Sequence, residues 1–387
     1  MTPGRPVPPP LGRPLPDLDS PLGDPRDDEG RLVAALGARS AEGGLEPVTL
    51  ARRAPAPDDV EILIEFCGLC HSDVHSTRGE WGSANYPLVP GHEIVGRVLR
   101  VGPAVTDFAV GDRVGVGCMV DSCRECEACE DGLEQYCSRG MVGTYGATDV
   151  RHGNERTQGG YARTVVVDRN YVLRVPESLD PAAAAPLLCA GITTYSPLRH
   201  AGVEAGDDVG VVGLGGLGHM AVKLAKAMGA TVTVFTTLES KRQAAAALGA
   251  DRVVNSRDEE QMRDASDSVD VIIDTVAAPH DLNALLRTLR RDGVIYQLGL
   301  PSGEMPPVDP GLLIRKRAAY AGSLIGGIAE TQEMLDFCAE HSLTSDIELV
   351  GAEQVNQAFD RMVAGDVKYR FVLDNSTLQP AGKEADA

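Results

Sequence analysis

The sequence predicts a two-domain α/β protein in which a β-rich, partly barrel-like domain is followed by a doubly wound parallel sheet. The chain has 387 residues, and one hydrophobic core rarely grows that large. Residues 31–176 read as short β-type runs separated by Gly, Pro and Asp, which is typical of a β-rich domain. Residues 208–300 alternate short aliphatic strands with helices, and this alternation indicates βαβ units.

The individual elements follow from these patterns. The β-type runs of the first domain span 60–66, 94–101, 113–118 and 162–167. Near Pro181 the texture changes to an Ala-rich helix, so we expect the second domain to start there. In that domain we expect strands at 208–212, 231–235, 252–255, 269–274 and 293–299, and helices that end at Met228 or cover 241–250 and 282–290.

Composition and charge exclude several classes of partner. Hydrophobic residues make up 43% and charged residues 24% of the chain, as in an ordinary globular protein. The formal net charge is -20, and such a surface repels nucleic-acid phosphates and anionic lipids, so we expect neither partner. No window reaches about 18 consecutive apolar residues, and the N-terminus lacks the apolar core of a secretory signal. The sequence therefore favours a cytoplasmic protein.

A Gly-rich turn follows the first strand of the second domain. It matches Gly-x-Gly-x-x-Gly, directly follows the strand expected at 208–212, and opens a helix with apolar residues at helical spacing. Glycines at these positions let the backbone approach a pyrophosphate, whose charge is favoured at a helix N-terminus. The pattern predicts a dinucleotide site. Its residues are Gly213, Gly215, Gly216, Leu217 and Gly218.

The end of the next strand indicates which dinucleotide binds. Sites that prefer NAD carry Asp or Glu there, which accepts a hydrogen bond from the ribose 2'-hydroxyl. Here the strand runs into Thr236 and Thr237, followed by Lys241 and Arg242. Two hydroxyls and two cations suit a 2'-phosphate, so NADP(H) is favoured. Glu239 would reverse this prediction if its carboxylate reached the ribose.

Four of the nine cysteines form a compact group, which in a reducing compartment is typical of a metal site. Cys123, Cys126 and Cys129 have the spacing Cys-x-x-Cys-x-x-Cys, and Cys137 follows after seven more residues. Four thiolates suit a tetrahedral structural zinc that has no open position. The rival iron–sulfur pattern has its fourth cysteine after three residues and before Pro, whereas Cys137 precedes Ser138. The spacing favours zinc.

A catalytic zinc needs fewer protein ligands and a position left for water or substrate. The candidates lie far apart in the sequence: Cys70, His92 with Glu93, and Cys189. Taken singly, each is better explained as a buried thiol or a satisfied core histidine. The sequence alone does not join them.

Three further cysteines are interpreted as core thiols. Cys67 and Cys70 have the Cys-x-x-Cys spacing of redox motifs, but Cys67 sits on an apolar strand-like run without a thioredoxin-like context. Cys118 and Cys338 receive the same interpretation.

Taken in order, the motifs resemble a known family, the zinc-dependent medium-chain dehydrogenases, in the cinnamyl-alcohol-dehydrogenase-like branch that includes bacterial broad-range aldehyde reductases. The resemblance covers about residues 60–375, through CGLCHSDVH, YPLVPGHEIVGRV, CRECEACEDGLEQYC, GGYA, APLLCAGITTYSPL, VGLGGLGHMAVKLAKAMGA and GSLIGG. It implies a homodimer in which residues 31–180 and 325–375 form a GroES-like catalytic domain and residues 181–324 a Rossmann NADP-binding domain. Residues 1–30 are rich in Pro, Gly and Asp and show no apolar period, so we expect a disordered leader there. We expect residues 376–387 to be a tail.

The resemblance also implies roles for individual residues. It makes Cys70, His92 and Cys189 the ligands of a catalytic zinc, with Glu93 as an occasional or fourth ligand. Asp73 matches the carboxylate that orients the imidazole ligand by accepting its other N–H.

A proton relay is implied as well. Ser72 matches the hydroxyl that hydrogen-bonds the substrate oxygen, and His75 matches the histidine that exchanges a proton with solvent. His71 is expected to face the pyrophosphate.

The function implied is a zinc-dependent NADP(H) alcohol dehydrogenase or aldehyde reductase of broad specificity, with two zinc ions per chain and a small aldehyde or primary alcohol as substrate. Trp81 either lines the substrate pocket or packs within its loop. The segment SRGMVGTYG lacks the pocket tryptophan of the plant lignin-forming enzymes, which argues against hydroxycinnamyl specificity. Two alternatives remain: an NAD-linked polyol or secondary-alcohol dehydrogenase of the same fold, and a non-catalytic zinc-binding redox sensor.

Overall fold

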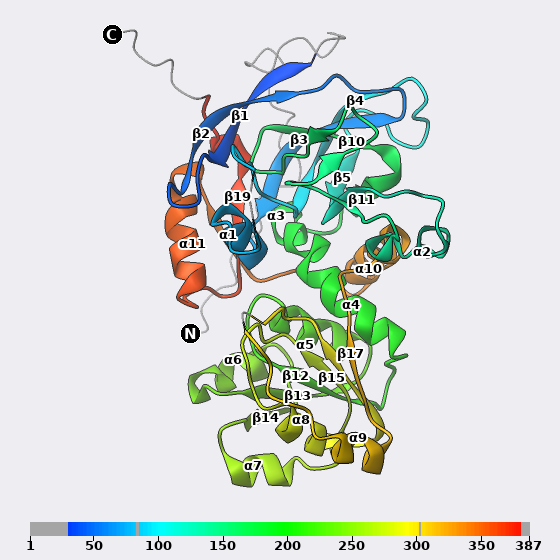
Figure 1. The fold of residues 1–387 in the computed structure, drawn as a ribbon, viewed down its shortest axis with the longest axis vertical. Helices are drawn as coiled ribbons and strands as arrows, with labels where there is room; N and C mark the ends of the chain where they lie inside the picture. The colour runs from blue at the N-terminus through cyan, green and yellow to red at the C-terminus, as the bar shows by residue number, and fades with distance from the viewer. Residues whose placement is uncertain (1–29, 83–84, 302, 381–387) are drawn as a thin grey trace, which may run out of the picture.

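The computed structural model describes residues 30–82, 85–301 and 303–380. Residues 1–29 of the expected leader and 381–387 of the expected tail therefore lie outside the described residues, whereas residues 376–380 of that tail are described and include the buried Leu378. Two large sheets organise the chain, and the long helix α4 (Ala190–His200) lies between them (Figure 1). The first sheet is built mainly of antiparallel strands and the second is wholly parallel. The chain therefore has the GroES-like and Rossmann α/β fold that the sequence predicts.

The strands of the β-rich part are β1 (Arg31–Ala38), β2 (Leu45–Arg52), β3 (Asp59–Gly68), β4 (Ile94–Val101), β5 (Arg113–Val116), β6 (Met119–Asp121), β7 (Val142–Gly143), β8 (Thr148–Asp149), β9 (Glu155–Arg156), β10 (Thr164–Asp168), β11 (Leu173–Arg174), β18 (Ile347–Val350) and β19 (Arg370–Asp374). Its main sheet has the order β11-β5-β4-β3-β19-β18, and β10 pairs with β3. The helices on or near these strands are α1 (His71–Thr77), α2 (Glu127–Glu130), α3 (Pro181–Ala184), α10 (Ile328–Glu340) and α11 (Val355–Val363), with 3-10 turns η1 (Glu134–Tyr136), η2 (Arg169–Tyr171), η3 (Ala185–Leu188), η5 (Ala352–Gln354) and η6 (Asn375–Thr377).

The parallel sheet has the order β14-β13-β12-β15-β16-β17. Its strands are β12 (Asp208–Val212), β13 (Thr231–Thr236), β14 (Arg252–Asn255), β15 (Val269–Asp274), β16 (Leu289–Gln297) and β17 (Ala319–Gly322). The helices are α5 (Gly218–Ala227), α6 (Arg242–Ala247), α7 (Glu259–Asp264), α8 (Leu282–Thr288) and α9 (Pro310–Lys316), with turn η4 (Glu239–Lys241). Strand order reverses between β12 and β15, the point at which open α/β sheets bind ligands.

Strand pairing moves the ends of two expected elements. The helix predicted over 282–290 ends at Thr288, because Leu289 pairs with Val269 of β15 and starts strand β16. The strand predicted over 113–118 ends at Val116, and Cys118 follows it. In both cases strand pairing, which the local pattern does not contain, sets the boundary.

Burial explains why the strand-rich segments fold as they do. Nearly every side chain of β3 is buried, since the strand has neighbours on both edges and helices against the sheet. In the second sheet Val209, Val211, Val232 and Val234 are fully buried, as expected for β-branched residues in parallel strands that are covered on both faces. In the described part of the chain, none of the helices has the length and apolar character needed to span a bilayer.

Candidate active site

Antiparallel pairing brings the first two candidate ligands together. In the register of β3 and β4, Cys67 lies opposite Ile94. Cys70 comes just after the end of β3 and His92 just before the start of β4, so both emerge at the same end of the sheet. Cys189 reaches the same place from the end of η3, where it is the N-cap residue of α4.

One buried carboxylate fixes two of these residues. The Oδ2 atom of Asp73 accepts the backbone N–H of Cys70 at 2.9 Å, which caps the short helix α1. Its Oδ1 atom lies 3.1 Å from Nδ1 of His92 and also accepts the N–H of Gly91. Tyr161 donates its hydroxyl to the same carboxylate. With Nδ1–H donating to Asp73, the nitrogen of His92 left with a lone pair is Nε2.

The four candidate residues form one buried group. The ligand atoms of Cys70, His92, Glu93 and Cys189 all lie within 4.8 Å of one another. Both carboxylate oxygens of Glu93 lack a hydrogen-bond partner among the described residues, and a buried carboxylate is costly unless it is both paired and hydrogen-bonded. Two thiols, an imidazole and a carboxylate are the donors that zinc prefers. The donor set and the unsatisfied carboxylate therefore fit a metal ion.

Burial and neighbouring groups shift the acidities in this group. Burial raises the pKa of Glu93 to about 7, against the opposing effect of Arg370. A hydrogen bond with Cys189 holds the pKa of the Cys70 thiol well below its usual value. Although burial opposes it, Asp73 raises the pKa of His92. A low thiol pKa favours the thiolate, which is the form that binds metal.

Arg370 joins this group to the parallel sheet and was not found from the sequence. It is buried at the start of β19, with Nη1 3.4 Å from the Glu93 carboxylate and 3.3 Å from the Leu69 carbonyl. A Cβ added at Gly216 would lie 2.6 Å from its Nε atom. Its guanidinium therefore lies between the candidate metal ligands and the Gly-rich turn. The only sequence signal was a charged residue opening the apolar strand RFVLD.

The Gly-rich turn has the shape that a phosphate-binding turn needs. Gly213 adopts φ 84°, where side chains are disfavoured. A Cβ added at Gly218 would lie 2.1 Å from the Gly213 carbonyl, whereas one at Gly215 would meet no described atom within 4 Å. Helix α5 begins at Gly218, directly after Leu217. The open space beside Gly215 and the helix N-terminus fit a pyrophosphate.

The residues expected at the 2'-phosphate differ in their burial and in the groups that they contact. Thr236 is buried at the end of β13, and Thr237 is exposed. Lys241 lies against the Gly-rich turn, because its Nζ donates to the Leu214 carbonyl at 2.8 Å. Arg242 pairs with Glu239 at 2.5 Å. The Glu239 carboxylate is therefore engaged with a cation of its own segment.

The expected relay residues lie on helix α1. The hydroxyl of Ser72 is 3.6 Å from the Cys70 sulfur. His75, one turn further along, is half-buried, and its Nδ1 lies 2.5 Å from the Glu80 carboxylate. The exposed Trp81 ring lies 5.1 Å from the His75 ring. His71 is exposed at the start of the helix. The sequence reasoning missed the Glu80 and Trp81 contacts with His75.

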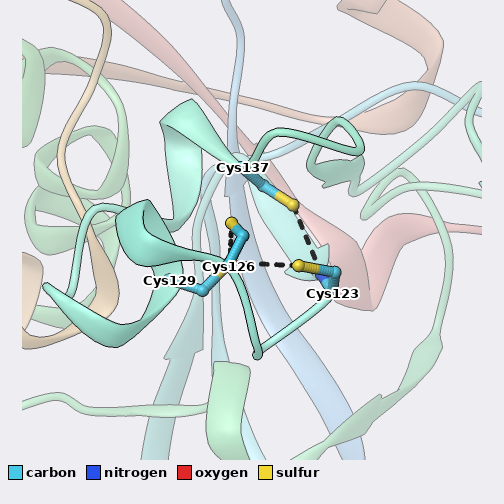
Figure 2. Close-up of side chains that lie close together, drawn as sticks. All are labelled: Cys123, Cys126, Cys129 and Cys137. Atoms are coloured by element: carbon cyan, nitrogen blue, oxygen red, sulfur yellow. Dashed lines mark hydrogen bonds between the residues drawn. The ribbon is translucent and has the colours of Figure 1, made fainter.

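The second cysteine group forms a lobe at the surface. The four side chains of Cys123, Cys126, Cys129 and Cys137 point toward one another (Figure 2). The sulfurs of Cys126 and Cys129 are 3.5 Å apart, and those of Cys123 and Cys129 are 3.8 Å apart. A backbone hydrogen bond from Ser138 lowers the pKa of Cys126 to about 5, which favours its thiolate. Four converging sulfurs fit a closed tetrahedral site.

The remaining cysteines divide into two kinds. Cys67 and Cys338 are fully buried, which confirms the prediction of core thiols. Cys118 is only half-buried, and its thiol is a hydrogen-bonding neighbour of Cys189. It therefore lies beside the candidate metal group. Its sequence context, the end of an expected apolar strand, gave no signal of this position.

Comparison with known proteins agrees with this arrangement. Residues 56–177 match the family described as alcohol dehydrogenase GroES-like domain, and residues 216–340 match the family described as zinc-binding dehydrogenase. The chain is 57% identical over 348 residues to aldehyde reductase YahK of Escherichia coli (strain K12), an alignment that covers 89% of this chain and 99% of that protein. It is 54% identical over 349 residues to NADP-dependent alcohol dehydrogenase C 1 of Mycolicibacterium smegmatis, with coverage of 90% and 99%.

Solved structures give the same result. A cinnamyl alcohol dehydrogenase of Sorghum bicolor (SbCAD4) has a TM-score of 0.88 and 46% identity, and the match covers 91% of this chain and 100% of that one. The Helicobacter pylori CAD complexed with NADP(H) has a TM-score of 0.84 and 40% identity, with coverage of 90% and 100%. The chain belongs to the zinc-dependent medium-chain alcohol dehydrogenases, in their cinnamyl-alcohol-dehydrogenase-like branch.

Proposed function

We propose that this protein interconverts primary alcohols and aldehydes as a zinc-dependent, NADP(H)-linked dehydrogenase of broad specificity. One observation carries the proposal: the ligand atoms of Cys70, His92, Glu93 and Cys189 converge within 4.8 Å, and Arg370 connects them to a dinucleotide-type turn. Two relatives with more than half their residues identical support it, since one is named an aldehyde reductase and the other an NADP-dependent alcohol dehydrogenase.

In this proposal, different residues of the site would bind the metal and orient its imidazole ligand. When bound, zinc polarises the substrate carbonyl and the nicotinamide supplies hydride. Cys70, His92 and Cys189 would hold the metal, with Glu93 as an additional ligand, and Asp73 would keep the His92 imidazole in the correct tautomer.

Proton transfer would run along helix α1. Ser72 would exchange a proton with the substrate oxygen. His75, which lies nearer the surface and is held by Glu80, would exchange protons with solvent.

The cofactor would lie on the Gly-rich turn. We assign its 2'-phosphate to Thr236, Thr237, Lys241 and Arg242, and its pyrophosphate to the N-terminus of α5 and His71. The ion pair between Glu239 and Arg242 supports this assignment, because it engages the first carboxylate after the end of β13 with a cation of its own segment. In this proposal residues 31–180 and 325–375 form the catalytic domain, and residues 181–324 form the cofactor domain.

We further propose two zinc ions per chain, a homodimer and a cytoplasmic location. The converging thiols of the surface lobe support the second zinc and suit a reducing compartment. The outer edge of β17 supports the dimer. This strand pairs only with β16 among the described strands, and Tyr320 on it is 39% exposed. Unpaired strand edges readily pair with another chain.

Kinetics and metal analysis test the function together. NADPH consumption should be measured against a panel of aliphatic and aromatic aldehydes, and turnover with NADH should be compared over aldehydes and polyols. Equal or better use of NADH would contradict the cofactor assignment, and a preference for polyols would favour the NAD-linked alternative.

The redox-sensor alternative is tested with Cys70→Ser, for which Cys67→Ser is the matched control because Cys67 is a buried thiol on the adjacent strand. We expect Cys70→Ser to abolish turnover while the lobe keeps its zinc. One zinc in the wild-type chain, or unchanged activity of Cys70→Ser, would favour the sensor.

A further inference from the structure

The four-cysteine lobe reaches across to the loop that leaves the parallel sheet. This loop, residues 323–327, connects β17 to α10. The phenol oxygen of Tyr136 accepts the backbone N–H of Leu324 at 3.1 Å. The carboxylate of Glu134 accepts the backbone N–H of Ile328, also at 3.1 Å. Both side chains come from η1, directly before the last cysteine of the lobe, so the lobe satisfies backbone donors more than 180 residues away.

The lobe and the loop are in direct contact. A Cβ added at Gly327 would lie only 1.8 Å from the Gly132 carbonyl oxygen, so only glycine permits this approach. In Figure 1 the lobe, marked by α2, lies beside the start of α10. Helix α10 begins after Gly327 without a side-chain cap of its own. Glu134 therefore supplies, from another element, an acceptor and a charge that are favourable at a helix N-terminus.

Between the two hydrogen-bonded positions the loop has an uncommon conformation. Ile325 has φ 38°, a region that β-branched residues rarely enter and that costs about 1–3 kcal/mol. The side chain is nonetheless buried, with 8% exposure. Such a conformation persists only where its surroundings hold it. The bonds at Leu324 and Ile328 are on both sides of Ile325 and provide that restraint.

Ile325 faces the neighbourhood of the candidate catalytic group. With Gly326 it lines a small cavity that Cys118 and Leu188 also line. Leu188 directly precedes Cys189, and the Cys118 sulfur lies 3.8 Å from the Leu188 carbonyl. A substrate whose oxygen is at the metal group would extend its carbon chain along an apolar wall of this kind.

We propose that Glu134 and Tyr136 are positioning residues for the substrate pocket: they hold the loop 323–327 so that Ile325 keeps its place, and the surface lobe thereby sets which aldehydes fit. The proposal rests on the proposed function for the identity of the substrate, but the restraint itself is a property of the fold. Aldehydes with long or aromatic chains reach the wall, and short aldehydes do not.

Steady-state kinetics of the full-length, zinc-loaded protein with NADPH test the proposal. Tyr136→Phe removes one acceptor and Glu134→Ala the other. Each should raise KM for benzaldehyde about fivefold, the fold-change of one lost hydrogen bond. The kcat values for both aldehydes, and the KM for propanal, should each change less than about twofold. Glu134→Gln keeps an acceptor oxygen and should restore most of the wild-type KM. Glu130→Ala, an exposed carboxylate of the same lobe, is the matched control.

Amide hydrogen exchange provides a readout that does not depend on activity. Exchange in the segment 319–332 should be at least about fivefold faster in Tyr136→Phe and Glu134→Ala than in the wild type and Glu130→Ala, because a backbone donor has lost its acceptor. Zinc content should be the same in all variants.

The outcomes separate this proposal from the proposed function. If the wild type reduces no aldehyde, the proposed function fails, and the exchange rates still decide whether the lobe restrains the loop. If exchange accelerates while the ratio of the benzaldehyde and propanal KM values stays constant, the contacts are structural only and the positioning role is overturned. If both readouts match Glu130→Ala, the restraint itself is refuted.

Discussion

Replacing His219 by Gln should make the protein less sensitive to acid. The imidazole is fully buried on α5, where it stacks on Tyr369 at 4.8 Å and Nε2 lies 3.0 Å from the Ser345 hydroxyl. These contacts join the parallel sheet to the β-rich part. Burial, and then the charges of Arg370 and Lys223, lower the pKa of His219 from 6.5 to about 3.

The sign and size of the effect follow from this shift. Above pH 6.5 the ring is neutral in both the folded and the unfolded chain, and His219 contributes no pH dependence. Between pH 6.5 and about 3, the unfolded chain binds a proton that the folded chain does not. The free energy of unfolding therefore decreases as the pH is lowered through this range. The loss is about 1.4 kcal/mol per pH unit, or about 2 kcal/mol at pH 5. The value at pH 5 is nearly the same for any folded pKa below about 4.

Urea unfolding followed by circular dichroism at pH 7 and pH 5 measures this loss. At pH 7, His219→Gln should be less stable than the wild type by about 1 kcal/mol, because the stacking on Tyr369 is gone. Between pH 7 and pH 5 the wild type should lose about 2 kcal/mol more than the variant, so that their order reverses. Ser345→Ala keeps the imidazole and should retain the wild-type pH dependence. Equal losses for the wild type and His219→Gln would refute the reasoning.

Three other predictions concern the site and the assembly. Asp73→Asn removes the carboxylate that orients His92 and should weaken the proposed binding of zinc at Cys70, His92 and Cys189 by about 10–100-fold in chelator competition, without weakening the proposed zinc binding by the four-cysteine lobe. Lys241→Ala should raise KM for NADPH about tenfold and leave KM for NADH nearly unchanged, because only the 2'-phosphate loses a charge-assisted contact; equal effects on both cofactors would contradict the assignment. Tyr320→Glu introduces a charge at the exposed edge of β17 and should shift dimers to monomers in sedimentation velocity; an unchanged sedimentation coefficient would contradict the proposed interface.

Features encoded by nearby residues could be predicted from the sequence. The four cysteines of the lobe lie within one short segment, so their spacing alone indicates that the sulfurs converge. The Gly-rich turn was found because its strand, turn and helix are consecutive. The end of α8 was not predictable in the same way. Leu289 continues the helical spacing of Leu282, Leu285 and Leu286, yet pairing with β15 places it in a strand. A local pattern cannot weigh a competing partner that lies elsewhere in the chain.

The candidate metal group of Cys70, His92, Glu93 and Cys189 is intermediate between these cases. The separation of Cys70, His92 and Cys189 in the sequence gives no reason to combine them, and a resemblance to known sequences was needed to do so. In the structure the reason is the register of β3 and β4, which places the residues after one strand beside those before the next. Cys118 is a residue whose surroundings could not be predicted from its own sequence context. Its apolar context predicts a core thiol, whereas the turn after β5 brings it to Cys189.

Three of the residues that sequence reasoning missed share one property: each contacts a segment far away in the chain. Arg370 reaches Leu69 across 301 positions, Glu134 reaches Ile328 across 194, and His219 meets Ser345 across 126. All three act where the β-rich part meets the parallel sheet or the loop that leaves it. In the proposed function the substrate and the cofactor are held by these different parts of the chain, so their relative position depends on such contacts rather than on the motifs themselves. A relative could therefore keep every metal and Gly-rich motif and still differ in substrate range through these connecting residues.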